Sequence, residues 1–207
     1  MNHHTILKIS HTEAHTDLLG PGDRFVVWVH GCCFDCEGCL ARNTRFGACQ
    51  ETSVSGMAQE IIESGCEGLT LSGGEPFLQA EALAELVREV QTRRDVGVIV
   101  YSGFTLEELR ERSDAPALLR KTDILIDGRY VKQLDDGRAY IGSSNQRLHY
   151  LTDRYKAEGE KYYSAQKRRA EIRFTADTVT LIGVPSANVL AVWREIKAKN
   201  GGAENDF

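Results

Sequence analysis

The sequence predicts an α/β fold with a parallel core sheet. Short apolar runs, such as FVVWV at 25–29 and VGVIVY at 96–101, alternate with amphipathic helical patterns, as in β-α-β units. Continuous apolar runs are typical of strands buried on both faces, as parallel strands are. Glycine-containing turns follow the runs, at the sheet edge where α/β folds place their binding sites. We expect one domain over residues 1–207, long enough for a substantial core.

Hydrophobic periodicity and capping residues place the individual elements of this core. The order of strand, helix and strand predicts parallel pairing through right-handed crossovers. Strands are predicted at 5–10, 25–29, 68–72, 96–101 and 123–126, and helices at 52–64, at 79–93 and after the capping residue Thr105.

The C-terminal part of the chain has a weaker pattern than the core, which we place at about 20–147. Residues 154–170 carry eight charges with little periodicity, which indicates a solvated segment. A hairpin that turns at Ala176-Asp177 and a helix at 187–199 complete a predicted C-terminal unit over 171–199.

Composition excludes several classes of function. A net charge of -5 gives no electrostatic signature of nucleic-acid or anionic-membrane binding. No apolar run approaches the roughly 20 residues of a membrane span, and the first ten residues lack a signal-peptide core, so we expect a cytoplasmic protein. Four of the six cysteines lie within eight positions, which does not indicate a disulfide framework. Cys49 and Cys66 are isolated, and we interpret them as buried or incidental thiols.

The most informative stretch is the cysteine loop, residues 30–39, which follows the strand at 25–29. Cys32, Cys36 and Cys39 have C-x3-C-x2-C spacing, and soft thiolates select zinc, copper(I) or iron–sulfur centres. Three ligands leave one metal position open, which favours an iron–sulfur cluster with a reactive iron. Cys33 offers a second spacing, C-x2-C-x2-C, although neighbouring side chains point apart and are not expected to share one metal. The alternative is a structural zinc site completed by His30.

A second motif, SGGEP at 72–76, follows the predicted strand at 68–72. Its two glycines allow backbone amides to approach a ligand closely, and the carboxylate of Glu75 suits an ammonium group. The same residues are also compatible with a plain turn before a helix that begins at Pro76.

Together, the two motifs resemble those of radical S-adenosylmethionine (SAM) enzymes. Finer similarity points to the anaerobic ribonucleotide reductase activating proteins and covers about residues 20–147. That similarity lies in GPGDRF (20–25), HGC (30–32), EGC (37–39), TLSGGEP (70–76), DILIDG (123–128) and SSNQ (143–146).

The resemblance implies a fold, an activity and a partner. It implies an incomplete β/α barrel with a lateral opening for a macromolecular substrate. Cys32, Cys36 and Cys39 would hold a 4Fe-4S cluster, and SAM would chelate the fourth iron. Reductive cleavage of SAM would give a 5′-deoxyadenosyl radical that abstracts hydrogen from a partner, the glycine of anaerobic ribonucleotide reductase. The reducing electron would come from a flavodoxin-like or ferredoxin-like donor. The organic chemistry itself belongs to the cofactors.

The resemblance also implies where SAM is held. The glycines and carboxylate of the second motif would bind its amino group, and the cysteine loop would approach the adenine through the backbone. A serine after the third core strand would reach the carboxylate or ribose, although it also suits an ordinary turn. Asp127 would face the same cavity or begin a turn with Gly128. The expected SAM contacts are Gly38, Leu40, Ser72, Gly73, Gly74, Glu75 and Ser102.

Three departures from the family pattern leave other functions open. Leu40 replaces an expected histidine or phenylalanine, Cys33 stands where proline is common, and the chain continues further after Asp127 than in compact activases. One alternative is a radical SAM enzyme that modifies a ribosomal peptide or a small molecule. A second is a non-catalytic zinc-binding interaction module.

Overall fold

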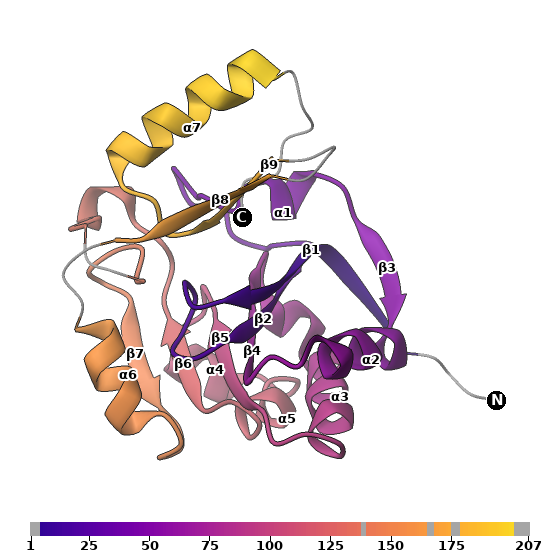
Figure 1. The fold of residues 1–207 in the computed structure, drawn as a ribbon. Helices are drawn as coiled ribbons and strands as arrows, with labels where there is room; N and C mark the ends of the chain where they lie inside the picture. Colours follow the sequence, from indigo (N-terminus) through magenta and orange to yellow (C-terminus); the bar gives the residue numbers. More distant parts are fainter. Residues whose placement is uncertain (1–4, 138–139, 165–167, 175–178, 201–207) are drawn as a thin grey trace.

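The protein forms a mixed seven-stranded sheet with helices packed against it (Figure 1). The computed structural model describes residues 5–137, 140–164, 168–174 and 179–200. The strand order is β3-β1-β2-β4-β5-β6-β7. The strands are β1 (Ile6–Thr16), β2 (Arg24–Val29), β3 (Gln50–Ser53), β4 (Gly68–Gly73), β5 (Gly97–Tyr101), β6 (Ile124–Asp127) and β7 (Arg147–Tyr150).

The centre of the sheet is parallel, as the sequence predicts. β2, β4, β5 and β6 are parallel neighbours in chain order. The outer strands are antiparallel: β1 pairs with β2, β3 with β1, and β7 with β6. The sequence pattern did not reveal β3 or β7, because both are short edge strands without a continuous apolar run. The architecture is therefore mixed α/β with a mostly parallel centre.

Local sequence signals explain where the helices begin. Ser53 caps α2 by accepting a hydrogen bond from the Gly56 amide, and Thr105 and Glu108 form a capping box at α4. The helices are α1 (Asn43–Phe46), α2 (Val54–Ser64), α3 (Ala80–Gln91), α4 (Leu106–Glu111), α5 (Pro116–Leu119), α6 (Lys156–Tyr163) and α7 (Ala187–Asn200), with 3-10 turns η1 (Pro76–Gln79) and η2 (Lys132–Leu134).

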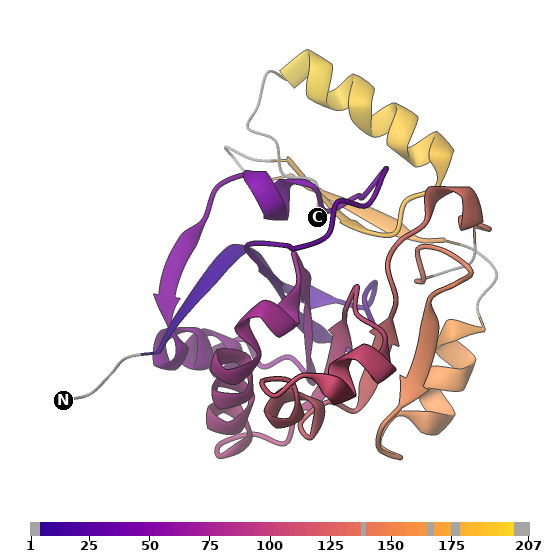
Figure 2. The same cartoon turned by 180° about the vertical axis from the view of Figure 1, so that it is seen from behind.

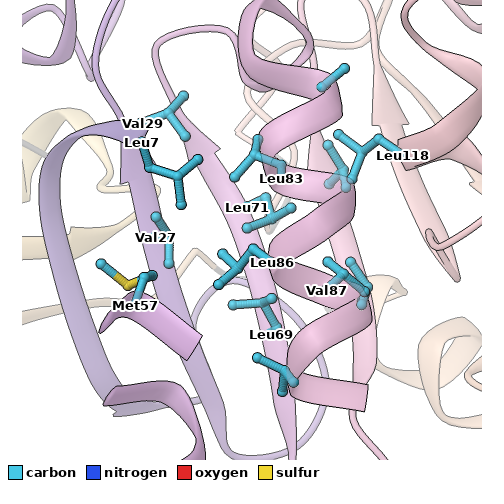
Figure 3. Close-up of a cluster of buried hydrophobic side chains, with 14 of the residues drawn as sticks. Leu7, Val27, Val29, Met57, Leu69, Leu71, Leu83, Leu86, Val87 and Leu118 are labelled. Carbon is cyan, nitrogen blue, oxygen red and sulfur yellow. The ribbon is translucent and has the colours of Figure 1, made fainter. Parts of the chain in front are cut away.

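The main core lies between one face of the sheet and the helices α2, α3 and α5. Figure 3 shows Leu83 and Leu86 of α3 facing Leu69 and Leu71 of β4. These four side chains are fully buried. Burying a leucine contributes about 1.5–3 kcal/mol, so this layer fixes the strands whose carboxyl ends carry the two motifs.

The opposite face of the sheet is covered by C-terminal segments (Figure 2). The segment predicted to be solvated at 154–170 contains α6, whose charged residues are exposed, while Tyr155 and Tyr163, at the two ends of this helix, pack on β5 and β6. The aromatic rings of these tyrosines make the packing contacts. The hydrophobic pattern of the segment does not reveal them, because lysines and glutamates stand between the tyrosines. The buried guanidinium of Arg24 lies on the same face and donates to Thr70, Tyr155 and main-chain carbonyls.

The predicted hairpin and final helix are present. β8 (Ala170–Phe174) pairs antiparallel with β9 (Val179–Gly183), and α7 follows. The predicted turn at Ala176-Asp177 lies outside the described residues. Ile182 of β9 packs on Trp28 and Val26 of β2, so the hairpin closes over the sheet. Within the described ranges, no helix has the length and apolar character to cross a membrane.

Candidate active site

The two sequence motifs meet at the carboxyl ends of β2 and β4. The parallel register pairs Trp28 with Ser72 and Val29 with Gly73. The Gly74 amide donates to the Val29 carbonyl at 2.9 Å, and the Glu75 amide donates to the Gly31 carbonyl at 2.8 Å. A side chain at position 74 would collide with the Gly31 carbonyl. The second glycine therefore lets the two loops pack backbone to backbone.

The cysteine loop is shaped by two glycines with positive φ. Gly31 has φ +96° and Gly38 has φ +74°, in the left-handed region that other residues rarely adopt. The Cys39 amide donates to the Cys36 carbonyl at 3.2 Å, which forms a tight turn between these two cysteines. The chain therefore reverses direction between the first and last thiols.

One open cavity of about 150 Å³ joins the cysteine loop to the ends of β4 and β5. Gly38 and Leu40 are not among its lining residues; Gly38 lies against Lys132 and Tyr130. Cys33 is exposed and also does not line the cavity, which favours the spacing through Cys32. The expected site residues that line the cavity are Cys32, Cys36, Cys39, Ser72, Gly73, Gly74, Glu75 and Ser102.

Burial favours the neutral form of two of the cluster-ligand candidates, Cys32 and Cys39. Burial raises the pKa of Cys32 to about 11, although the Phe34 amide opposes this. Burial also raises the pKa of Cys39. Thiolates are the ligands of soft metals, so binding of a cationic centre must release these protons.

The spacing of the thiols fits a cluster better than a single zinc ion. Zinc bound at about 2.3 Å from each sulfur requires sulfurs roughly 3.8 Å apart. The sulfurs of Cys32, Cys36 and Cys39 do not all lie within 4.8 Å of one another. His30, the proposed fourth zinc ligand, has its Nδ1 3.1 Å from Ser10 Oγ. An inorganic cluster spans thiols more widely, so this geometry disfavours the zinc interpretation.

Glu75 connects the ends of β4 and β5. Its carboxylate is fully buried and accepts hydrogen bonds from the Phe77 amide (2.9 Å), Ser102 Oγ (2.9 Å) and the Gly103 amide (2.7 Å). Burial raises its pKa to about 7, despite these three donors. Within the described part of the chain, no cationic side chain forms an ion pair with Glu75. An ammonium group of a ligand would therefore supply the missing counter-charge.

Asp127 does not face this cavity. It is buried, and it accepts hydrogen bonds from the Leu106 amide (2.6 Å) and from Arg147 (2.7 Å). His149 Nε2 also lies 3.0 Å from its Oδ2. Asp127 therefore anchors α4 and the edge strand β7 to the end of β6.

The SSNQ loop shapes part of the cavity wall. Gln146 lines the cavity, accepts from the Gly142 and Ser143 amides through Oε1 and donates to the Gly128 carbonyl. Asn145 donates to the Arg129 carbonyl at 2.8 Å. These bonds hold the segment that follows β6 in place.

Sequence reasoning missed several aromatic and cationic residues of the lining. Tyr101 is the last residue of the predicted third core strand, and Arg129 lies three positions after the end of the fourth, a signal that could have identified them. Arg129 stacks over Phe34, with 4.6 Å between the guanidinium carbon and the ring centroid. Arg42 and Arg45 lie in the segment after the cysteines. Arg45 pairs with Asp35, which also lines the cavity, and Arg129 pairs with Glu108. Guanidinium groups suit the carboxylate of an amino acid ligand, so these arginines are candidates to bind it.

Comparisons with known proteins agree with this geometry. Residues 18–149 match the family described as a 4Fe-4S single cluster domain, and the chain belongs to this family. Its family match ends within β7, so α6, the hairpin and α7 lie beyond it.

Individual relatives indicate which proteins within this family the chain resembles. The chain is 35% identical to the anaerobic ribonucleoside-triphosphate reductase-activating protein of Enterobacteria phage T4 over 141 residues, 65% of this chain and 88% of that protein. The protein of that name from Vibrio cholerae is 34% identical over 143 residues, 64% of this chain and 91% of that protein. The pyruvate formate-lyase-activating enzyme of Listeria monocytogenes is 37% identical over 73 residues, 32% of this chain and 29% of that enzyme. The resemblance inferred from the motifs is confirmed.

Proposed function

We propose that this protein is a radical SAM activase that installs the glycyl radical of an anaerobic ribonucleoside-triphosphate reductase. The observation that carries the proposal is the single cavity shared by three cysteines and the SGGE strand end. The names of the relatives support the same partner class.

The residues of the chain divide into two groups with different tasks. Cys32, Cys36 and Cys39 would hold the 4Fe-4S cluster, and Glu75 with the strand-end glycines would hold the amino group of SAM. When bound and reduced, this cofactor pair supplies the electron transfer and hydrogen abstraction. The Phe34 ring, packed edge-on against Phe104, gives the cavity an apolar wall beside the half-buried cysteines.

The same proposal includes the type of barrel, the cellular location and the electron donor. We assign residues 1–207 to one radical SAM domain with a partial β/α barrel, because four parallel strands present both motifs at one edge. A cytoplasmic location suits free thiols, which oxidising compartments convert to disulfides. The reducing electron would come from a flavodoxin-like or ferredoxin-like protein.

Anaerobic reconstitution tests the proposal. The cluster-loaded protein is incubated with SAM, a reductant and an anaerobic ribonucleoside-triphosphate reductase, and the glycyl radical is measured by electron paramagnetic resonance. We expect a glycyl signal together with 5′-deoxyadenosine, and neither with Cys36→Ala. Cys49→Ala is the matched control, because Cys49 is an exposed thiol outside the loop. Formation of 5′-deoxyadenosine without a glycyl signal on the reductase would refute this partner and favour a peptide or small-molecule substrate.

A further inference from the structure

A second group of metal-ligand side chains lies at the opposite end of the sheet from the cysteine loop. His15 belongs to β1, Asp23 precedes β2, and Cys66 precedes β4. Their ligand atoms all lie within 4.8 Å of one another. β2 runs six residues from this group to the start of the cysteine loop, which places the two sites about 20 Å apart. No part of the proposed activase chemistry uses these residues.

A distortion of β1 directs His15 toward this group. The β1–β2 pairing shifts register between Glu13 and Thr16, and His15 has φ +59°. Bulges of this kind re-aim a side chain, and positive φ is costly for a residue other than glycine. The His15 amide donates to Cys66 Sγ at 3.4 Å, and Arg173 donates to the His15 carbonyl at 2.6 Å. The distorted backbone is therefore held from both sides.

The side chains converge on one point from three separate segments. His15 Nδ1 lies 2.8 Å from Asp23 Oδ2 and 3.7 Å from Cys66 Sγ. In a Cys-His-Asp relay, opposite nitrogens of the imidazole would contact the thiol and the carboxylate. Here the same nitrogen faces both groups, which does not suit a proton relay. It does suit three ligands arranged around a cation.

We propose that His15, Asp23 and Cys66 form a zinc site distinct from the cysteine-loop site. Tetrahedral zinc requires about 3.6 Å between sulfur and nitrogen ligands and about 3.4 Å between nitrogen and oxygen ligands. The observed 3.7 Å and 2.8 Å need only a small movement of the exposed His15 ring to reach these values.

The surroundings favour a cation at this point. Glu67 lies beside the group and accepts a hydrogen bond from the Asp23 amide at 3.1 Å, which adds negative charge near the ligands. Cys66 is buried, whereas His15 and Asp23 reach solvent, so an ion has an entry path and a fourth position for water. A bound ion would join the ends of β1, β2 and β4.

Zinc content and zinc coordination test the proposal on the cluster-loaded protein. The protein is equilibrated anaerobically with zinc and dialysed, and zinc is quantified and examined by X-ray absorption at the zinc edge. We expect one zinc per chain with a single sulfur ligand, and zinc should raise the unfolding temperature. A zinc ion misplaced in the cysteine loop would instead show up to three sulfur ligands, which separates the two sites.

Two variants and one control complete the test. Cys66→Ser and His15→Asn should each lose the bound zinc and the zinc-dependent rise in unfolding temperature. Asn tolerates positive φ, so His15→Asn removes the ligand with little change in backbone. Cys49→Ser, at an exposed cysteine elsewhere, should bind zinc as the parent does. Absence of zinc from the parent, or unchanged single-sulfur zinc in both variants, would overturn the proposal.

Discussion

The substitution Glu75→Gln tests how SAM is bound, because it changes charge while keeping shape. The amide oxygen of glutamine can accept the bonds that Oε1 accepts from Phe77 and Ser102. The new NH2 group then faces the Gly103 amide, itself a donor 2.7 Å away. A buried donor left without an acceptor costs about 1–3 kcal/mol of folding free energy. We expect a less stable protein that still folds and still binds its cluster.

The effect on SAM follows from the lost charge. A hydrogen bond to a charged group contributes about 1.5–3 kcal/mol. At about 1.4 kcal/mol for each tenfold change, the dissociation constant of SAM should rise about 10- to 150-fold. Burial raises the pKa of Glu75 to about 7, so the parent should bind SAM more weakly as the pH falls below 7 and the carboxyl group is protonated. Glu75→Gln should lack this pH dependence.

Equilibrium dialysis of SAM against the cluster-loaded protein measures both quantities between pH 6 and 8. Glu107→Gln is the matched control, because Glu107 is an exposed carboxylate paired with Arg147 outside the cavity. If Glu75→Gln binds SAM within twofold of the parent, with the same pH dependence, then the buried carboxylate does not contact the ammonium group.

Three further substitutions test the fold that carries the site, each by urea unfolding of the anaerobically prepared protein. Arg24→Lys should lower the free energy of unfolding by about 2–5 kcal/mol, because lysine cannot replace all five hydrogen bonds of the buried guanidinium; a loss below 1 kcal/mol would contradict this. Leu86→Ala should cost about 2–5 kcal/mol by opening a cavity between α3 and the sheet, and an unchanged urea midpoint would refute that packing. Asp127→Asn should cost about 1–3 kcal/mol at pH 7. Burial raises the pKa of Asp127, but bonds from Arg147 and the Leu106 amide outweigh it and hold that pKa below its usual range. Its stabilisation is present above about pH 4 and is lost as the pH falls through the lowered pKa, so the difference from the parent should shrink in acid; a difference that is constant with pH would contradict the ion pair.

Much of the site could be predicted because its signals are local. The cysteine spacing and the SGGEP turn each lie within ten residues, and the apolar runs before them predict the strands β2 and β4. The structure brings eight of the expected residues to one cavity, but Gly38 and Leu40 do not line it. The positive φ of Gly38 is sufficient to explain a glycine at this position. The contact between Gly38 and SAM stays a prediction.

The sequence by itself determined the parallel order of the central strands, the helix caps and the position of the thiol loop. These features depend on periodicity and on turn chemistry among neighbouring residues. Only the tertiary structure decided that Glu75 binds Ser102, that β7 and β3 complete the sheet, and that tyrosines of the charged segment cover it. Each of these depends on contacts between segments far apart in the chain, which carry no local pattern. The convergence of His15, Asp23 and Cys66 is of the same kind, because strand register brings together three residues that are separately unremarkable in sequence.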